Sequence, residues 1–183
     1  NHKSMNWLSN KLFYTIGITL LCGGLHAQSL AEAKKLYNEG KYAEAKPAFE
    51  KLVKQAPSNS SYNHWYGVCC YETGDLTGAE KHLKVAVKRK VQEAYRYMSE
   101  VYYKTYRFDE AGEMLEEYIL LQIQSAGSYG IPLSSLGNRI RMRFGDFKVR
   151  DYGFSQFKQY IASFPDVEFV DDEERTRAVY MEE

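Results

Sequence analysis

Apolar residues in the first two thirds of the chain recur with the spacing of amphipathic helices, in short segments separated by turns. Between residues 29 and 120 the small and large apolar positions fall in phase from one segment to the next. From residue 130 to 181 the pattern changes to two helical stretches and then two runs in which apolar and polar residues alternate. A helix buries one stripe and a strand one face, so this order predicts a helical array followed by a small helix–helix–hairpin module.

The helical segments form an internal repeat. The motif GKYAEA at residues 40–45 returns as GDLTGA at 74–79 and as YRFDEA at 106–111, at intervals of 34 and 32 residues. The other positions in phase are Phe49, Leu52 and Pro57, then Tyr66, Gly67 and Leu83, then Met98, Tyr102 and Leu115. The pattern resembles the tetratricopeptide repeat family and implies three helical hairpins, a mainly α solenoid, over residues 28–121. Such arrays bind protein and have no chemistry of their own.

The first helices of such hairpins line a concave groove, where a partner segment binds. By helical phase, we expect the groove to display aromatic and basic side chains, namely Tyr37, His64, Tyr71, Arg96, Tyr103 and Lys104. Tyrosine offers a large contact area at low entropy cost and the cations hold acidic groups, so this set favours an extended peptide. Ordinary packing is the alternative interpretation, because the chain contains 16 tyrosines.

The C-terminal third is predicted to form a winged helix. One helix, capped by a serine, is expected to end at Phe144, and a second is expected over residues 154–164. Alternating runs at 167–170 and 177–181 are expected to pair as a β-hairpin. No proline or polar linker lies between residue 109 and about residue 124, so one helix can close the array and also open the module.

The sequence of this module contains four short motifs. They are IPLSSLG at residues 131–137, RF at 143–144, DYGFSQF at 151–157 and FP at 164–165. These residues resemble the LOTUS family, also called the OST-type helix-turn-helix, and we assign them a domain over residues 122–183. The resemblance implies a non-enzymatic winged helix that binds single-stranded or guanine-rich RNA, although some family members bind a helicase instead. Gly137, Tyr152 and Gly153 are interpreted as structural.

Charge is balanced over the whole chain, with 24 basic and 24 acidic residues, so no global field recruits nucleic acid. The winged module is uneven, because residues 126–160 hold six basic and two acidic side chains. The residues expected to contact RNA are Arg139, Arg143, Lys148, Arg150, Gln156 and Lys158. So few cations predict weak, salt-sensitive binding. Docking of a protein on the same face is the alternative.

The N-terminus is expected to be a secretory signal over residues 1–27, with Met5 as the start. The apolar run at 12–25 is too short to cross a bilayer core of about 30 Å, which favours a removable signal over a stable membrane anchor. We therefore expect a bacterial protein exported to the periplasm or envelope. A cytoplasmic location is the alternative, if the leader is not functional or belongs to a different gene from the winged helix.

No catalytic group, cofactor or metal site is expected, nor a small-molecule substrate. After the leader only Cys69 and Cys70 remain, and adjacent cysteines rarely meet disulfide geometry. The histidines have no Cys or His partner at ligand spacing. The enzyme alternative takes a cysteine nucleophile with His64 or His82 as base, but Cys70 falls at a core position and nothing orients either histidine.

These patterns together predict a mainly helical, non-enzymatic adaptor. Its tetratricopeptide array holds a protein segment and its winged helix binds RNA. The alternative function follows from the leader: an exported envelope scaffold in which both modules bind only protein.

Overall fold

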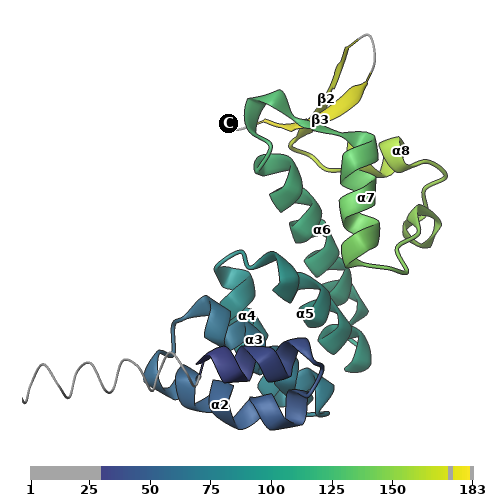
Figure 1. Cartoon of the computed structure of the whole chain (residues 1–183). Helices are drawn as coiled ribbons and strands as arrows, with labels where there is room; N and C mark the ends of the chain where they lie inside the picture. The colour runs from purple at the N-terminus through teal and green to yellow at the C-terminus, as the bar shows by residue number, and fades with distance from the viewer. Residues whose placement is uncertain (1–29, 173–174, 182–183) are drawn as a thin grey trace, which may run out of the picture.

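The computed structural model of the chain describes residues 30–172 and 175–181 (Figure 1). The secretory signal predicted for residues 1–27 lies outside these described residues. Within them, no helix is both long enough and apolar enough to cross a membrane. The described chain is mostly helical, with one small sheet near its C-terminal end.

Successive helices form the array. Residues 30–38 are helical, and they are followed by α2 (Tyr42–Gln55), α3 (Ser60–Glu72), α4 (Leu76–Lys88), α5 (Gln92–Lys104) and α6 (Phe108–Gln124). Short turns join consecutive helices, which pack against each other in sequence order (Figure 1). The structure therefore confirms the predicted solenoid of three helical hairpins.

Left-handed turn residues and polar caps set where these helices begin. Gly40 and Gly74 precede α2 and α4 with φ angles of 74° and 83°, a conformation that glycine adopts at little cost. Asp75 then caps α4, because its side chain accepts a hydrogen bond from the backbone nitrogen of Gly78 at 2.8 Å. Such a cap satisfies a helix donor that has no partner within the helix.

Close packing inside the array depends on a glycine in the middle of α3. A Cβ added at Gly67 would lie 2.8 Å from Cγ of Leu83 and 3.1 Å from the backbone nitrogen of the same residue in α4. The second of these atoms belongs to the backbone, so a side chain at this position would displace α4 itself. The small and large residues of the repeat pattern therefore meet at this contact.

The C-terminal module surrounds a three-stranded sheet. Its elements are η1 (Gly127–Tyr129), β1 (Ile131–Pro132), α7 (Leu133–Arg143), η2 (Val149–Tyr152), α8 (Phe157–Ala162), β2 (Val167–Asp171) and β3 (Thr176–Tyr180), where η marks a 3₁₀ turn. All strand pairs are antiparallel, in the order β1-β3-β2, and Phe169 lies opposite Ala178. This order of helices and hairpin is that of a winged helix, as predicted.

Three details differ from the prediction. Helix α7 begins at Leu133, directly after Pro132, and has no side-chain cap, so no serine caps it. The second helix, α8, is shorter than the expected span of 154–164. Gly153 has a left-handed φ of 82° and Gln156 is extended with a φ of −132°, so the chain turns twice before it becomes helical. The short strand β1 was absent from the prediction, because two residues are too few to show alternation.

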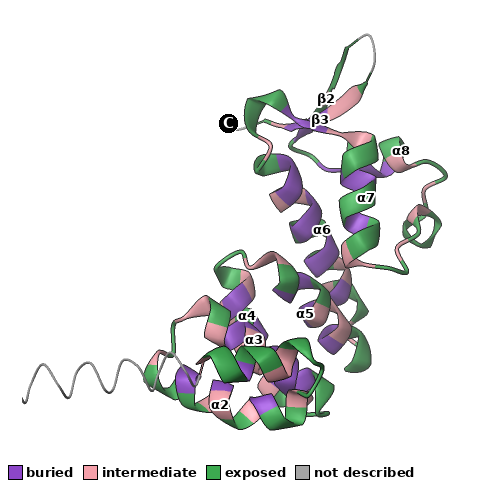
Figure 2. Cartoon of the chain, in the orientation of Figure 1, coloured by how far each residue is buried: buried purple, intermediate pink, exposed green. Residues whose placement is uncertain are grey.

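Helix α6 belongs to both modules. Near its middle, the ring of Tyr118 lies 6.2 Å from that of Tyr95 in α5 and 5.4 Å from that of Phe144, which follows α7. One turn later, Gln122 accepts a hydrogen bond from Arg139 of α7 at 2.9 Å. Buried residues of both modules form one continuous apolar cluster, and Figure 2 shows buried segments along much of α6. One shared helix therefore couples the two modules.

Aromatic rings fill the core of the winged module. The ring of Tyr160 is almost fully buried, and its centroid lies 5.2 to 5.8 Å from those of Phe147, Tyr152, Phe154 and Phe164. These rings come from the segment after α7, from η2 and from both ends of α8. The aromatic residues of the LOTUS-like motif therefore hold the irregular segments of the module together.

Candidate binding cleft between the two modules

A cleft lies where the last hairpin of the array faces the winged module, and its volume is about 600 Å³. Its array side includes Tyr71, Arg96, Glu100, Tyr103 and Lys104, and its winged side includes Phe144, Phe147, Lys148, Asp151 and Tyr152. Four of the six predicted groove residues are in this lining, together with one of the predicted RNA-binding residues. Side chains of the two predicted surfaces thus share one cleft.

On the side of the cleft formed by the array, Glu100 holds two neighbouring side chains by hydrogen bonds. Its carboxylate accepts a hydrogen bond from Arg96 at 2.6 Å, and the hydroxyl of Tyr71 donates to its other oxygen. The ammonium group of Lys104 lies 4.2 Å from the centroid of the Tyr71 ring, within the range of a cation–π contact. Burial raises the pKa of Tyr71, so its hydroxyl remains a donor at neutral pH.

Each module contributes an exposed aromatic ring to the cleft. Tyr103 projects from the last turn of α5, and Tyr152 belongs to η2. Inside the winged module, the Tyr152 ring packs against the rings of Phe147 and Tyr160, with centroid distances of 5.8 Å and 5.2 Å. Exposed apolar surface of this kind is typical of interaction sites. The cleft can therefore hold an extended segment against two aromatic surfaces.

Two predicted groove residues, Tyr37 and His64, do not line this cleft. The Tyr37 ring packs edge-on against those of Tyr42 at 5.4 Å and Phe49 at 6.0 Å. His64 is buried beside Tyr97, and its Nδ1 has no hydrogen-bond partner among the described residues. Helical phase placed both on the groove face, where His64 is buried and Tyr37 is half-buried.

The two predicted arginines of α7 are held at the seam between the modules. Arg139 donates a hydrogen bond to Gln122 of α6 at 2.9 Å, and Arg143 pairs with Glu93 of α5 at 3.3 Å. Each arginine uses one nitrogen for this contact, and Arg139 remains exposed whereas Arg143 is half-buried. Both are therefore oriented by α5 or α6, with other N–H groups of the guanidinium left to donate.

The other predicted RNA-binding residues are exposed on the winged module. Lys158 forms a long ion pair with Asp171 of β2 at 3.7 Å, and Gln156 lies just before α8. Lys148 and Arg150 flank the start of η2, and neither has an ion pair within the described residues. These two cations are therefore the members of the predicted set that are best placed to meet a ligand.

The aromatic wall of the cleft is what the sequence pattern missed. Apolar spacing assigns Phe144 to the core of the module, and the family motif marks Tyr152 as structural. Both pack against core rings, as does Phe147. They also reach the cleft, because residues 144–152 pass close to α5. No signal in the sequence could indicate this approach, since it depends on how α7 packs against α6.

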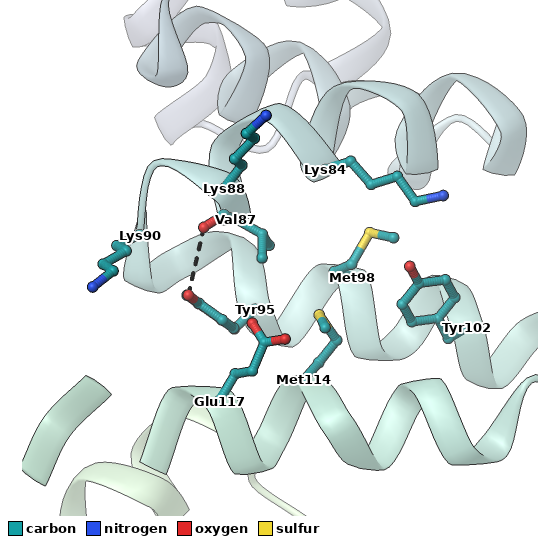
Figure 3. Close-up of a pocket in the computed structure, with 9 residues that line it drawn as sticks. All are labelled: Lys84, Val87, Lys88, Lys90, Tyr95, Met98, Tyr102, Met114 and Glu117. Atoms are coloured by element: carbon teal, nitrogen blue, oxygen red, sulfur yellow. Dashed lines mark hydrogen bonds between the residues drawn. The ribbon is translucent and has the colours of Figure 1, made fainter. Parts of the chain in front are cut away.

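A smaller cavity of about 370 Å³ lies between α4, α5 and α6 (Figure 3). Apolar side chains form its floor and lysines its rim: Val87, Met98 and Met114 in the first group, and Lys84, Lys88 and Lys90 in the second. Figure 3 shows the lysine side chains pointing away from one another. Lys84 is also paired with Glu80 at 2.5 Å. The cations do not converge, so this cavity offers no site for an anion.

The enzyme alternative finds no support in the geometry of its residues. Cys69 and Cys70 are buried, which raises the pKa of their thiols to about 12 and about 11. Such thiols are protonated at neutral pH and are poor nucleophiles. His64 is buried, while His82 is hydrogen-bonded to Asn63 at 2.8 Å. Within residues 30–172 and 175–181, no group of three or more His, Cys, Asp or Glu side chains could hold a metal ion.

Two family models match the chain, one after the other. Residues 30–94 match the tetratricopeptide repeat, and residues 100–177 match the OST-HTH/LOTUS domain. The chain therefore combines a tetratricopeptide repeat segment with an OST-HTH/LOTUS domain, two classes of interaction module without catalytic chemistry. The second match begins within α5, which agrees with a helix shared between the modules.

Known proteins share parts of this architecture. The TPR repeat-containing protein MJ1428 of Methanocaldococcus jannaschii is 27% identical over 134 residues, which cover 73% of this chain and 22% of that protein. The structure of the MamA RS-1 ArsTM double mutant has a TM-score of 0.51 at 16% identity and covers 55% of this chain and 57% of that one. The MamA MSR-1 C2 structure has a TM-score of 0.50 at 19% identity, with 55% and 59% covered. The chain thus spans about a fifth of its curated relative, and the structural likeness shows the fold of the array.

Proposed function

We propose that this protein is a non-enzymatic adaptor that holds an extended protein segment in the cleft between its modules and RNA on its winged helix. The binding of a protein segment, which we call the protein half of the proposal, is supported by the cleft itself. There, fixed polar groups of the array face exposed rings of the winged module. Both modules belong to classes whose role is interaction, which agrees with an adaptor.

The cleft suits a segment with both apolar and charged side chains. Tyr103 and Tyr152 offer aromatic surface for apolar groups. Lys104 and Lys148 offer ammonium groups for a carboxylate of the bound segment. A segment that contacts these four residues contacts both modules at once.

Selection from a displayed library of random peptides tests the protein half. The full chain is expected to enrich peptides that bind with Kd on the order of micromolar in fluorescence anisotropy. Tyr103→Ser should weaken their binding about tenfold, because it removes a central aromatic contact. Met142→Ser is the matched control, since Met142 is highly exposed on α7 and does not line the cleft. Failure to enrich any peptide, or equal binding by Tyr103→Ser and the wild type, contradicts the proposal.

The RNA half is supported by the LOTUS match and by the positions of Lys148 and Arg150. Both are exposed, and neither has an ion pair within the described residues. Tyr152 follows them with a partly exposed ring on which a base can stack. Lys148 and Tyr152 also line the cleft, so RNA and the protein segment compete for these two residues. For single strands, each phosphate contact adds about 0.7 to the slope of log K against log salt, so two cations predict weak binding with a shallow salt dependence.

Fluorescence anisotropy with a guanine-rich single-stranded RNA at low salt tests this half. Lys148→Glu combined with Arg150→Glu should weaken binding about tenfold or more, because two attractive contacts become repulsive. The matched control is Lys88→Glu combined with Arg89→Glu, which reverses two exposed charges at the end of α4, in the array. Absence of binding by the wild type overturns the RNA half and leaves the protein half to its own experiment.

The location of the protein decides which of these partners it can meet. A functional leader over residues 1–27 takes the chain out of the cytoplasm, where RNA is abundant. Cell fractionation with N-terminal sequencing separates the cases. A mature chain that begins at Gln28 in the periplasm supports an exported scaffold with two protein-binding modules, whereas an uncleaved cytoplasmic chain supports RNA binding.

A further inference from the structure

Three large aromatic side chains are exposed at the corner where α5 turns into α6. Tyr103 is 66% exposed, Tyr106 is 84% exposed and Phe108 is 55% exposed. Their rings contact one another, with centroids 5.2 Å apart for Tyr103 and Phe108 and 6.3 Å apart for Tyr106 and Phe108. We call these three residues the aromatic corner. An apolar cluster of this size in contact with solvent is typical of an interaction surface.

The backbone of the corner holds Tyr106 in an unfavourable conformation. Its φ is 61°, in the left-handed region that disfavours residues with a Cβ. At the same position of the two preceding repeats the chain has Gly40 and Gly74, with φ angles of 74° and 83°. The third repeat therefore accepts strain at a site where glycine would avoid it, and it displays an aromatic ring as a result. Strain of this kind is concentrated at functional sites.

The corner is continuous with the cleft. Tyr103 belongs to both, and Tyr106 and Phe108 extend the aromatic surface beyond the cleft lining. A segment bound in the cleft can therefore continue over the corner without a break in its contacts. Because the two surfaces are continuous, we assign the corner the same ligand as the cleft, namely the bound protein segment.

The charge beside the corner specifies the chemistry of that segment. Asp109, Glu113 and Glu116 follow Phe108 at spacings that place them on one exposed face of α6. Helix α6 contains five acidic residues and no basic one. At the far end of this row, Glu116 is close enough to Tyr152 to add to the effect of burial in raising its pKa. Acidic side chains therefore run from the corner towards the winged wall of the cleft.

We infer that the aromatic corner and the acidic face of α6 form a docking surface for a basic protein segment, in which arginine or lysine side chains alternate with apolar ones. The inference rests on the proposed binding of a protein segment in the cleft. Arginine and lysine bind to aromatic faces by cation–π contacts and to carboxylates by charge, so the corner and the acidic row select the same side chains. The acidic row disfavours RNA here, because it repels phosphate.

The library selection described above also tests this inference. The enriched peptides, about twelve residues long, are expected to be rich in arginine or lysine together with aromatic or aliphatic residues. A fluorescein-labelled form of the most enriched peptide is then titrated against the full chain. Tyr106→Ser should weaken binding about tenfold, since Tyr106 lies in the corner and outside the cleft lining. Asp109→Lys combined with Glu113→Lys should also weaken it about tenfold, and should do so less at high salt.

Tyr129→Ser is the matched control, because Tyr129 is an exposed tyrosine in η1, beyond the opposite end of α6 from the corner. Peptides that need Tyr103 but bind equally well to Tyr106→Ser overturn the docking surface while the cleft proposal stands. Enrichment of peptides with more acidic than basic residues overturns the assignment of a basic segment, whereas a single carboxylate among basic residues agrees with Lys104 and Lys148 in the cleft. Failure to enrich any peptide overturns both proposals. Binding of guanine-rich RNA that Tyr106→Ser weakens would instead identify the corner as a stacking surface for bases.

Discussion

The array and the winged module build their cores by different means. In the array, small residues let neighbouring helices approach, as Gly67 does against Leu83, and the contacts join elements that are adjacent in sequence. In the winged module, the ring of Tyr160 packs against aromatic rings from irregular segments that precede and follow it in the sequence. Contacts between sequence neighbours show in a repeat period, whereas an aromatic cluster depends on the path of its loops. The two modules nevertheless share α6, so neither core is independent of the other.

The largest effect is expected from removal of the central ring of the winged module. Tyr160→Ala should lower the free energy of unfolding by about 3–5 kcal/mol, the usual cost of emptying a large aromatic site. Urea unfolding is followed by circular dichroism and by the fluorescence of Trp65, which lies in the array, with Trp7 changed to Phe in every chain. Because α6 is shared, both probes should report one transition in the parent protein and one lowered transition in the variant.

The control is Tyr160→Phe, since the Tyr160 hydroxyl is buried without a hydrogen-bond partner among the described residues. Loss of this hydroxyl should be neutral or should stabilise by about 1 kcal/mol, because no hydrogen bond is given up. Two separate transitions in the parent protein would contradict the coupling of the modules through α6.

The packing of the array is tested by two glycine substitutions with opposite expected signs. Gly67→Ala should destabilise the protein by about 1–3 kcal/mol, because its Cβ meets the backbone of α4. Gly112→Ala should stabilise by about 0.5–1 kcal/mol, because Gly112 lies in α6 with no atom within 4 Å of an added Cβ. Thermal unfolding measures both. Destabilisation by Gly112→Ala as well would show that helix spacing is not what distinguishes the two positions.

Buried His64 predicts a pH dependence that belongs to the array. Burial lowers its pKa to about 4, from an ordinary value near 6.5, so the folded state favours the neutral ring. The unfolded chain binds a proton first as the pH falls. The stabilising effect is therefore complete above pH ~6.5 and is lost between that value and pH ~4, by about 2 kcal/mol between pH 7 and pH 5. Urea midpoints at these two pH values measure it, and His64→Phe should remove that share of the difference. An unchanged pH dependence in His64→Phe would show that His64 is not its source.

The smallest effect is expected at the strained turn before α6. Tyr106→Gly should relieve the positive φ and stabilise the protein by up to about 1 kcal/mol, less the entropy that glycine gains in the unfolded chain. The same substitution should weaken binding of the selected peptide, as Tyr106→Ser does. Stability and binding should therefore move in opposite directions at this residue. A variant that is no more stable and binds equally well would show that Tyr106 has neither role.

Much of the fold was predictable because its signals are local. The phase of Ala45, Ala79 and Ala111 revealed the hairpins, and all three are buried. The shortened helix α8 was not predictable from apolar spacing, because residues 154–156 continue the pattern while their backbone does not become helical. The turn at Gly153, which the motif marked as structural, was the better guide to where this helix begins.

The candidate site was predictable only in part. Helical phase placed Tyr71, Arg96, Tyr103 and Lys104 on one face of the array, since a helix repeats its faces regularly, and the structure places all four in the lining of the cleft. His64 shares that phase but is buried, because elements from outside its own hairpin cover it. Phase tells which face of a helix a residue occupies, and it cannot tell what packs against that face.

The two kinds of module, their order and the residues that pack each hairpin can be predicted from sequence, because these features follow from spacing within a few helical turns. The contacts of the individual cations depend on tertiary packing. Arg139 and Arg143 contact Gln122 and Glu93 across the seam, whereas Lys148 and Arg150 have no ion pair within the described residues. The same packing of α7 on α6 brought residues 144–152 to α5 and made the cleft. Contacts between residues so distant in sequence are set by how whole elements pack, and no local pattern records them.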